Sequence, residues 1–388
     1  MELKKKKPST NYKRVLKKAI KCGLYLLFIL FIPKISFAQN NDFLPQSFID
    51  KLSNYFLWYY SSVQAGKIIK PKSQVLKDIG KIALRHCPID KKLIDNEAGF
   101  DNLSILLNEY LGEYGKAINI FTISDSEVVS CWLGDLVEES AGKRNIWGKE
   151  IEFLVKVIDS LEIKDSVYYL SKGKEALEVG VRDNVIYYNL ETYKLRANSL
   201  WEFFASRITE NKNRRYDPSK SDRLRKQLYY KSWFKLYSDC IKDSQNLEVS
   251  KSRFINQAID LLKENSLFHE IGHIFADKYL KLNDETKEEA LAFLSELRYG
   301  PLPYDSLDMV ISARYKNPIS NYKFAGDKII TDFIFYINNE QRKNVPDYKK
   351  IKIQGKDEIQ QMRNLFKLTE EQIRSISENI FRQEIGGI

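Results

Sequence analysis

Histidine, cysteine and methionine are all scarce in this chain of 388 residues, which has three histidines, four cysteines and three methionines. No two cysteines have Cys-x-x-Cys spacing, and this excludes a cysteine zinc site and a thioredoxin-like redox motif. Beyond the first 38 residues only Cys87, Cys131 and Cys240 remain. Because this is an odd set, at most one disulfide can form within the chain, and we expect these residues to be partly buried small hydrophobes.

The net charge of +10 does not indicate a nucleic-acid partner once its distribution is considered. Residues 1–38 contain ten Lys or Arg and one acid, whereas the other 350 residues contain 52 basic and 51 acidic groups. A phosphate backbone requires a basic surface on the folded protein. The sequence therefore predicts no nucleic-acid binding.

Residues 1–38 have the pattern of a secretory signal peptide. A basic stretch reaches Lys21, an apolar run of residues 22–32 follows, and Ser36 and Ala38 form a small-x-small cleavage site. The apolar run is shorter than the roughly 20 residues of a spanning helix, and no second run of spanning length follows. We expect cleavage after Ala38 and export to the periplasm or the medium. The alternative is a membrane anchor formed by an uncleaved signal.

Hydrophobic periodicity predicts a helix-rich α+β chain. After the signal peptide, residues 39–150 would form a mostly helical N-terminal region, although residues 117–136 mix strand-like and turn residues. Residues 149–162 are predicted as a helix. Short strands are expected further on, the last two as a hairpin, at residues 167–170, 179–181 and 185–188. A basic, polar loop is expected at residues 211–226.

The last 140 residues are predicted to be helical with clear boundaries. The helices would cover residues 252–282, 285–298, 323–338 and 357–385. The second of these would end at Gly300 and Pro301. Within the last, Thr369 and Gln372 match a capping box.

The most informative motif is His269-Glu270-Ile271-Gly272-His273. Residues at i and i+4 share a helix face, so both imidazoles can bind one metal ion, with Glu270 beside them to activate water. The competing interpretation is a pair of satisfied core histidines, but it must also account for an acid inside an apolar stretch.

Two histidines need a third protein ligand, and the following helix offers carboxylates. A third histidine six residues after the motif is absent, because Tyr279 stands there. Glu288, Glu289 and Glu296 all compete for this role. Glu289 is the first residue of a Glu-x-x-Ala motif. The small side chain of Ala292 in this motif would let the second helix pack closely on the first.

Residues 252–300 resemble the gluzincin group of zinc metallopeptidases, in which an HExxH helix precedes a helix bearing a glutamate ligand. The resemblance implies a zincin-like domain over residues 151–388, with two antiparallel helices and a small upstream sheet. It also implies that His269, His273 and Glu289 bind Zn²⁺, and that Glu270 is the general base for hydrolysis of a protein or peptide substrate. Two alternatives remain: a zincin-like binding or assembly protein without activity, and hydrolysis of a non-peptide bond.

Further roles follow from the same resemblance. Asp277, four residues after His273, could accept the second N–H of that ring. The strands around residues 179–188 could supply the edge along which an extended peptide binds. A transition-state stabiliser is also expected, with four candidates after the glutamate helix: Arg298, Tyr299, Tyr304 and Tyr315.

Overall fold

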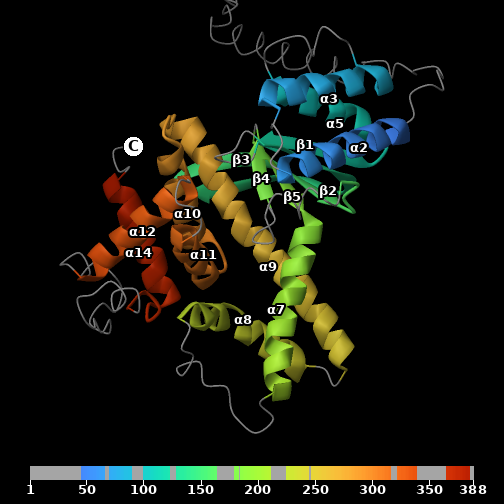
Figure 1. Ribbon diagram of the computed structural model, residues 1–388. Coiled ribbons are helices and arrows are strands. Elements are labelled where there is room, and N and C mark those ends of the chain that lie inside the picture. Colours follow the sequence, from blue (N-terminus) through green and yellow to red (C-terminus); the bar gives the residue numbers. More distant parts are fainter. Residues whose placement is uncertain are drawn as a thin grey trace, which may run out of the picture. The chain divides into compact units, whose positions relative to one another are not determined.

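The computed structural model describes residues 45–65, 70–89, 99–122, 128–163, 179–182, 184–210, 224–243, 246–315, 321–338 and 364–384. Helices dominate these ranges, and five strands form a mixed sheet (Figure 1). The predicted helix-rich α+β class is confirmed. The predicted signal peptide and the strand at residues 167–170 lie outside the described residues, as does most of the loop at 211–226.

Among the described residues, three helices precede the sheet: α2 (Pro45–Gln64), α3 (Lys72–His86) and α5 (Gly99–Gly112). They pack with β1 and the first residues of β2 around an apolar cluster. In α2 the buried side chains recur every three or four residues, at Phe48, Leu52, Phe56, Tyr59 and Tyr60. The helical prediction for this region therefore holds as far as residue 112, where the sheet begins to form.

The sheet has the strand order β1-β2-β3-β5-β4. Its strands are β1 (Lys116–Thr122), β2 (Val129–Ile146), β3 (Lys149–Asp159), β4 (Val179–Arg182) and β5 (Val185–Asn189). Neighbours are antiparallel except β3 and β5, which are parallel. The predicted hairpin of β4 and β5 is confirmed, with Val181 opposite Ile186. Residue 150, where we expected two domains to divide, lies just inside β3.

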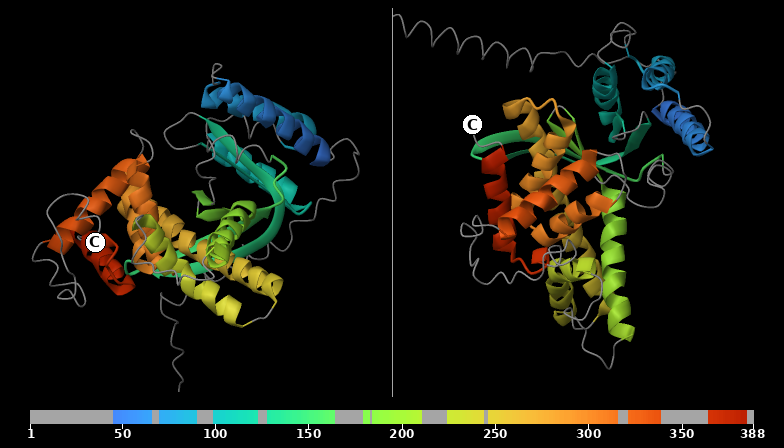
Figure 2. Two further views of the ribbon diagram at one scale, coloured as in Figure 1. Left: turned by 60° about the horizontal axis from the view of Figure 1, so that its bottom comes forward. Right: turned by 60° about the vertical axis from the view of Figure 1, so that its left-hand side comes forward.

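The helix predicted for residues 149–162 is wrong, because this segment is strand β3. Its buried apolar residues alternate along the strand: Ile151, Phe153, Val155 and Val157. The nearly continuous apolar run also fits a helical face, but the β-branched residues favour a strand. The long β2–β3 hairpin curves (Figure 2), and at its tip the Trp147 ring N–H donates to Ser295 Oγ over 2.9 Å.

Helices form the rest of the described chain. They are α7 (Leu190–Glu210), α8 (Leu224–Lys242), α9 (Leu247–Phe275), α10 (Glu285–Tyr299), α11 (Pro303–Tyr315), α12 (Asn321–Asn338) and α14 (Glu370–Glu384), with a π-helical turn at Ala276–Leu280. Helices α7, α8 and α11 were not expected, and α8 begins within the loop predicted for residues 211–226. The capping box is confirmed, since Thr369 Oγ1 accepts from the Gln372 N–H and Gln372 Oε1 from the Thr369 N–H.

Helix α9 is the central element of the fold. It contacts strands β3, β4 and β5, helices α7 and α8, and along its second half helix α10 (Figures 1 and 2). Its side chains are therefore buried on several sides, including those of His269 and Glu270. The buried residues in the second half of this helix are therefore held by packing against several neighbouring elements.

Two smaller findings bear on the sequence predictions. Cys87, Cys131 and Cys240 are buried free thiols, as expected for small core residues. Among the described residues, no helix has the length and apolar character needed to cross a membrane.

Candidate metal centre

The connection between α9 and α10 reverses the chain within nine residues. The π-helical turn extends α9 to Leu280, and Lys281 then takes a left-handed conformation with φ of 48°. Asp284 caps α10 by accepting from the N–H groups of Thr286 and Lys287, at 3.0 and 3.2 Å. A short link is thus enough to return α10 antiparallel along α9.

Small residues bring the two helices together at the centre of the motif. A Cβ on Gly272 would lie 2.6 Å from the Ala292 Cα and 3.0 Å from Ser295 Oγ, so glycine is needed at this crossing. The expected close packing at Ala292 is therefore present. It brings the glutamates of α10 within reach of the histidines of α9.

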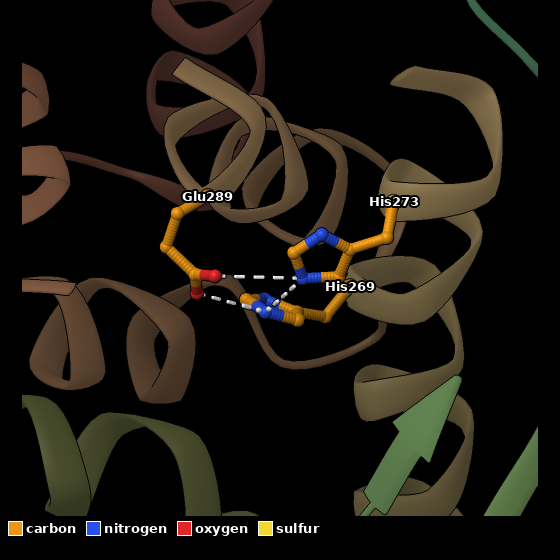
Figure 3. A group of neighbouring side chains, drawn as sticks. All are labelled: His269, His273 and Glu289. Atoms are coloured by element: carbon orange, nitrogen blue, oxygen red, sulfur yellow. Dashed lines mark hydrogen bonds and ion pairs between the residues drawn. The ribbon is translucent and has the colours of Figure 1, made fainter. Parts of the chain in front are cut away.

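His269, His273 and Glu289 converge on one point (Figure 3). The two Nε2 atoms are 3.3 Å apart. Glu289 Oε1 lies 3.2 Å from His269 Nε2, and its Oε2 lies 3.5 Å from His273 Nε2. One ligand atom from each of the three residues fits within 4.8 Å of the others.

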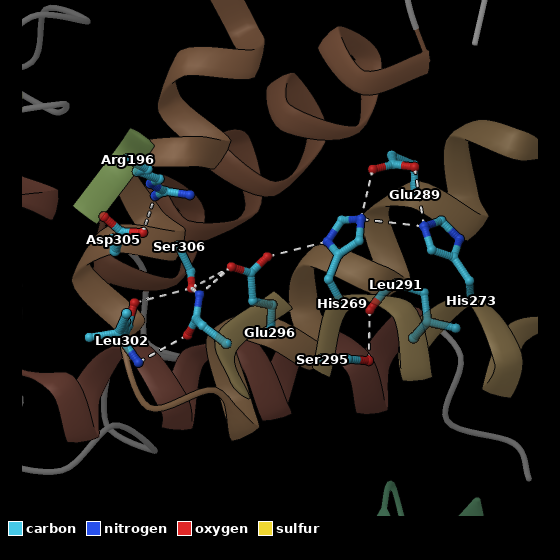
Figure 4. Close-up of polar contacts among 11 residues, drawn as sticks. Arg196, His269, His273, Glu289, Leu291, Ser295, Glu296, Leu302, Asp305 and Ser306 are labelled. Atoms are coloured by element: carbon cyan, nitrogen blue, oxygen red, sulfur yellow. Dashed lines mark hydrogen bonds and ion pairs between the residues drawn. The ribbon is translucent and has the colours of Figure 1, made fainter. Parts of the chain in front are cut away.

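The other two candidate glutamates contact the opposite nitrogens of the same rings, and Figure 4 shows the contact made by Glu296. Glu296 Oε2 lies 3.2 Å from His269 Nδ1, and Glu288 Oε1 lies 3.0 Å from His273 Nδ1. Of the three glutamates, only Glu289 faces both Nε2 atoms. Asp277 is exposed, and the Nδ1 contact that we expected it to make with His273 is made by Glu288.

Burial and the contacts between oppositely charged groups shift the pKa values of the cluster in opposite directions. Burial would lower the pKa of His269, but hydrogen bonds to Glu289 and Glu296 outweigh it and hold that pKa well above its usual value. The pKa of His273 is raised in the same way, against burial, by its hydrogen bond to Glu288. Burial would raise the pKa of Glu289, but its contacts with the two histidines outweigh burial and lower that pKa. The raised pKa values of the two histidines oppose the loss of the ring protons, which a metal ion would have to displace.

Glu270 is buried on α9, directly after His269 in the sequence. Burial raises the pKa of its carboxyl group, while the two histidines act to lower it. The pKa of Tyr188 on β5 is raised by burial and, to a smaller extent, by the charge of Glu270. Tyr188 in turn donates to the Lys263 carbonyl of α9 over 3.1 Å. The charge of Glu270 thus interacts both with the histidine pair and with Tyr188 of β5.

The expected transition-state stabilisers have other partners. Arg298 pairs with Glu378, Tyr299 Oη accepts from the Trp147 N–H, and Tyr304 Oη donates to the Leu368 carbonyl. The side chain of Tyr315 lies outside the described residues. His86 is bonded to Ser47 in the N-terminal helices, so the third histidine is not part of the cluster.

Sequence reasoning missed Tyr322, at the start of α12. Its hydroxyl hydrogen-bonds Glu289, and its ring packs edge-on against Phe293, with centroids 4.9 Å apart. Asn321 fixes this helix start by contacts with Glu285 and Thr286 in the first turn of α10. Nothing in the sequence distinguishes Tyr322 from the other 22 tyrosines.

The donor set suits zinc. Two imidazole nitrogens and one carboxylate oxygen are the protein ligands of many catalytic zinc sites, which leave a further position open. Each ligating ring also has a carboxylate on its other nitrogen, the arrangement that orients metal-binding histidines.

Comparison with known proteins gives no relative. No protein-family model matches the chain, and no curated protein or solved structure matches it either. The resemblance to gluzincins therefore rests on the motif and on the geometry of this cluster.

Proposed function

We propose that this chain is a zinc-dependent peptidase of gluzincin type. The proposal rests mainly on the way in which three glutamates contact different ring nitrogens of the two histidines. Glu289 faces both Nε2 atoms, whereas Glu288 and Glu296 each contact one Nδ1 atom. Two satisfied core histidines would not need a third carboxylate between their remaining nitrogens.

In this mechanism His269, His273 and Glu289 hold the zinc ion. Zinc, when bound, supplies a Lewis acid that polarises the substrate carbonyl and makes water more acidic. The Glu270 carboxylate accepts a proton from the attacking water and later delivers it to the amine leaving group. Burial favours the protonated form of this group, which assists the second step.

The hairpin of β4 and β5 supports a peptide as substrate. Among the described strands, β4 ends the sheet, and it packs beside α9. Val179 of β4 pairs with Tyr188, the residue affected by the charge of Glu270. An extended peptide added to the free side of such a strand gains main-chain hydrogen bonds. A zincin-like fold and export through the residue 1–38 signal complete the proposal.

The alternative is a zincin-like protein that binds or assembles without catalysis. A buried acid at position 270 argues against it, because such a protein gains nothing from keeping a carboxylate at this cost. Hydrolysis of a non-peptide bond would use the same groups, and substrate screening separates it from peptidase action.

The test is zinc content together with cleavage of a peptide library, for the wild type and for Glu270→Gln. We expect about one zinc per chain in both proteins, with cleavage reduced by about 10²–10⁴-fold in the variant. Glu264→Gln is a matched control, because Glu264 lies on the same helix and pairs with Arg144 away from the cluster. An active Glu270→Gln protein would refute the mechanism, and zinc without any cleavage would favour the binding alternative.

A further inference from the structure

The two oxygens of the Glu296 carboxylate have different partners. Oε2 faces His269 Nδ1, whereas Oε1 accepts hydrogen bonds from Asn265 Nδ2 and from Ser306 Oγ, the latter over 3.0 Å. The side chain of Glu296 is only 2% exposed. Water therefore does not compete for these contacts, and Oε1 depends on its two protein donors.

Asn265 is itself fixed in place. It lies one turn before His269 on α9, so both side chains project toward α10. Its Oδ1 accepts from the Leu302 N–H over 3.0 Å. A Cβ at position 300 would overlap that Oδ1, so Gly300 permits the close approach of the chain after α10.

Ser306 completes the set from a third helix. Its Oγ accepts from Asn265 Nδ2 over 2.9 Å and lies within hydrogen-bond distance of both Glu296 Oε1 and the Leu302 carbonyl. Buried polar contacts thus run from α11 through Glu296 to the ring of His269 (Figure 4). Asn265, Ser306 and Glu296 are not members of the proposed metal-binding group, which consists of His269, His273 and Glu289.

We propose that Asn265 and Ser306 are positioning residues of the metal centre. They fix the carboxylate of Glu296, which in turn fixes the ring of His269 with Nε2 toward His273 and Glu289. This inference rests on the proposed zinc site. Groups that orient a histidine ligand typically change metal affinity by about 10–100-fold when removed. A purely structural role would change folding stability and leave the affinity for zinc unaltered.

Two buried serines of α11 separate these roles. Ser306 and Ser312 each hydrogen-bond the carbonyl four residues earlier, on Leu302 and Asp308, but only Ser306 contacts Glu296. We would measure zinc dissociation constants by competition with a chromophoric chelator, the visible spectrum of the Co²⁺-loaded protein, and unfolding. Ser306→Ala should weaken zinc binding about tenfold and shift the Co²⁺ spectrum, while Ser312→Ala keeps both wild-type values.

Asn265→Asp is the second variant. Aspartate keeps the acceptor for the Leu302 N–H but replaces the donor to Glu296 with a like charge, so the loss of affinity should exceed that of Ser306→Ala. If this variant does not fold, the serine pair still decides. Equal zinc affinity for Ser306→Ala and Ser312→Ala, in a chain whose wild type binds zinc, would overturn the inference alone. A wild-type chain that binds no zinc would overturn the proposed function as well.

Discussion

Glu288 Oε1 lies 3.0 Å from His273 Nδ1, on the side of the ring away from Glu289. The two acids are neighbours in sequence, yet they contact different nitrogens of one imidazole. The side chain of Glu288 is 33% exposed and that of Glu296 only 2%. The two histidines therefore have unequal support, with the stronger constraint on His269.

This arrangement predicts an order of metal affinities. Glu289→Ala removes a ligand and should weaken zinc binding by more than about 100-fold, beyond the effect of losing an orienting group. Glu296→Ala should cost about 10–100-fold. Glu288→Ala should cost least, because water can replace an exposed carboxylate. Chelator competition measures all three, and a larger loss for Glu288→Ala or Glu296→Ala than for Glu289→Ala would mean that Glu289 is not the ligand.

Zinc binding should strengthen as the pH rises. Both histidines have a raised pKa, and their protons must leave before both Nε2 atoms can bind the metal. We expect zinc binding to release protons from the two rings, and fewer of them as the pH rises through the raised pKa values of the histidines. Calorimetry in buffers of different ionisation enthalpy measures this release directly. An affinity independent of pH across these pKa values would contradict the proposed ligation by the histidines.

The stability of the metal-free chain should change in the opposite direction. A raised pKa in the folded state means that the stabilising contribution of the histidines is complete below their unfolded value of 6.5. It is lost as the pH rises through the folded pKa. Glu289, with its lowered pKa, contributes above its unfolded value of 4.5. Both contributions are present between these two values. Denaturant unfolding of the metal-free chain should show the histidine contribution decline on the alkaline side and the Glu289 contribution decline on the acid side.

Much of this site could be predicted from the sequence, because its residues are close together along the chain. The i, i+4 spacing of His269 and His273 and the helical period around them lead to a shared face. The assignment of Glu288, Glu289 and Glu296 could not be made in this way. It depends on the rotation of α10 against α9, which is set by contacts such as that of Gly272 with Ala292.

The errors in the predicted fold also arise because tertiary contacts are not encoded in local sequence patterns. In β3 the apolar run fits both a helical and a strand period. Pairing with β2, its hairpin partner, and with β5, which lies further along the chain, determines that the segment is a strand. Tyr322 and Ser306 join the site through α12 and α11, whose packing no local pattern encodes. Helices α7, α8 and α11 were missed altogether. Local spacing predicts ligands on one helix, whereas the residues that orient them come from tertiary packing.

Enlarging the residue at the helix crossing should damage both the fold and the metal site. In Gly272→Ala the new Cβ would lie 2.6 Å from the backbone of Ala292, so the two helices must separate. Overpacking of this kind costs about 1–3 kcal/mol of unfolding free energy. Separation also moves Glu289 away from the histidines, so zinc affinity should fall. Gly112→Ala at the end of α5 has no atom within 4 Å of its Cβ and should leave zinc binding unchanged.

Removing the Tyr322 hydroxyl should affect the metal site without affecting its packing. Tyr322→Phe keeps the ring that packs against Phe293 but loses the hydrogen bond to Glu289. We expect zinc affinity to fall by about tenfold, the lower end of the range for groups that orient a ligand. Tyr336→Phe is a suitable control, because Tyr336 is a buried tyrosine of the same helix, near its other end. Equal zinc affinity in the two variants would show that the hydroxyl of Tyr322 does not position Glu289.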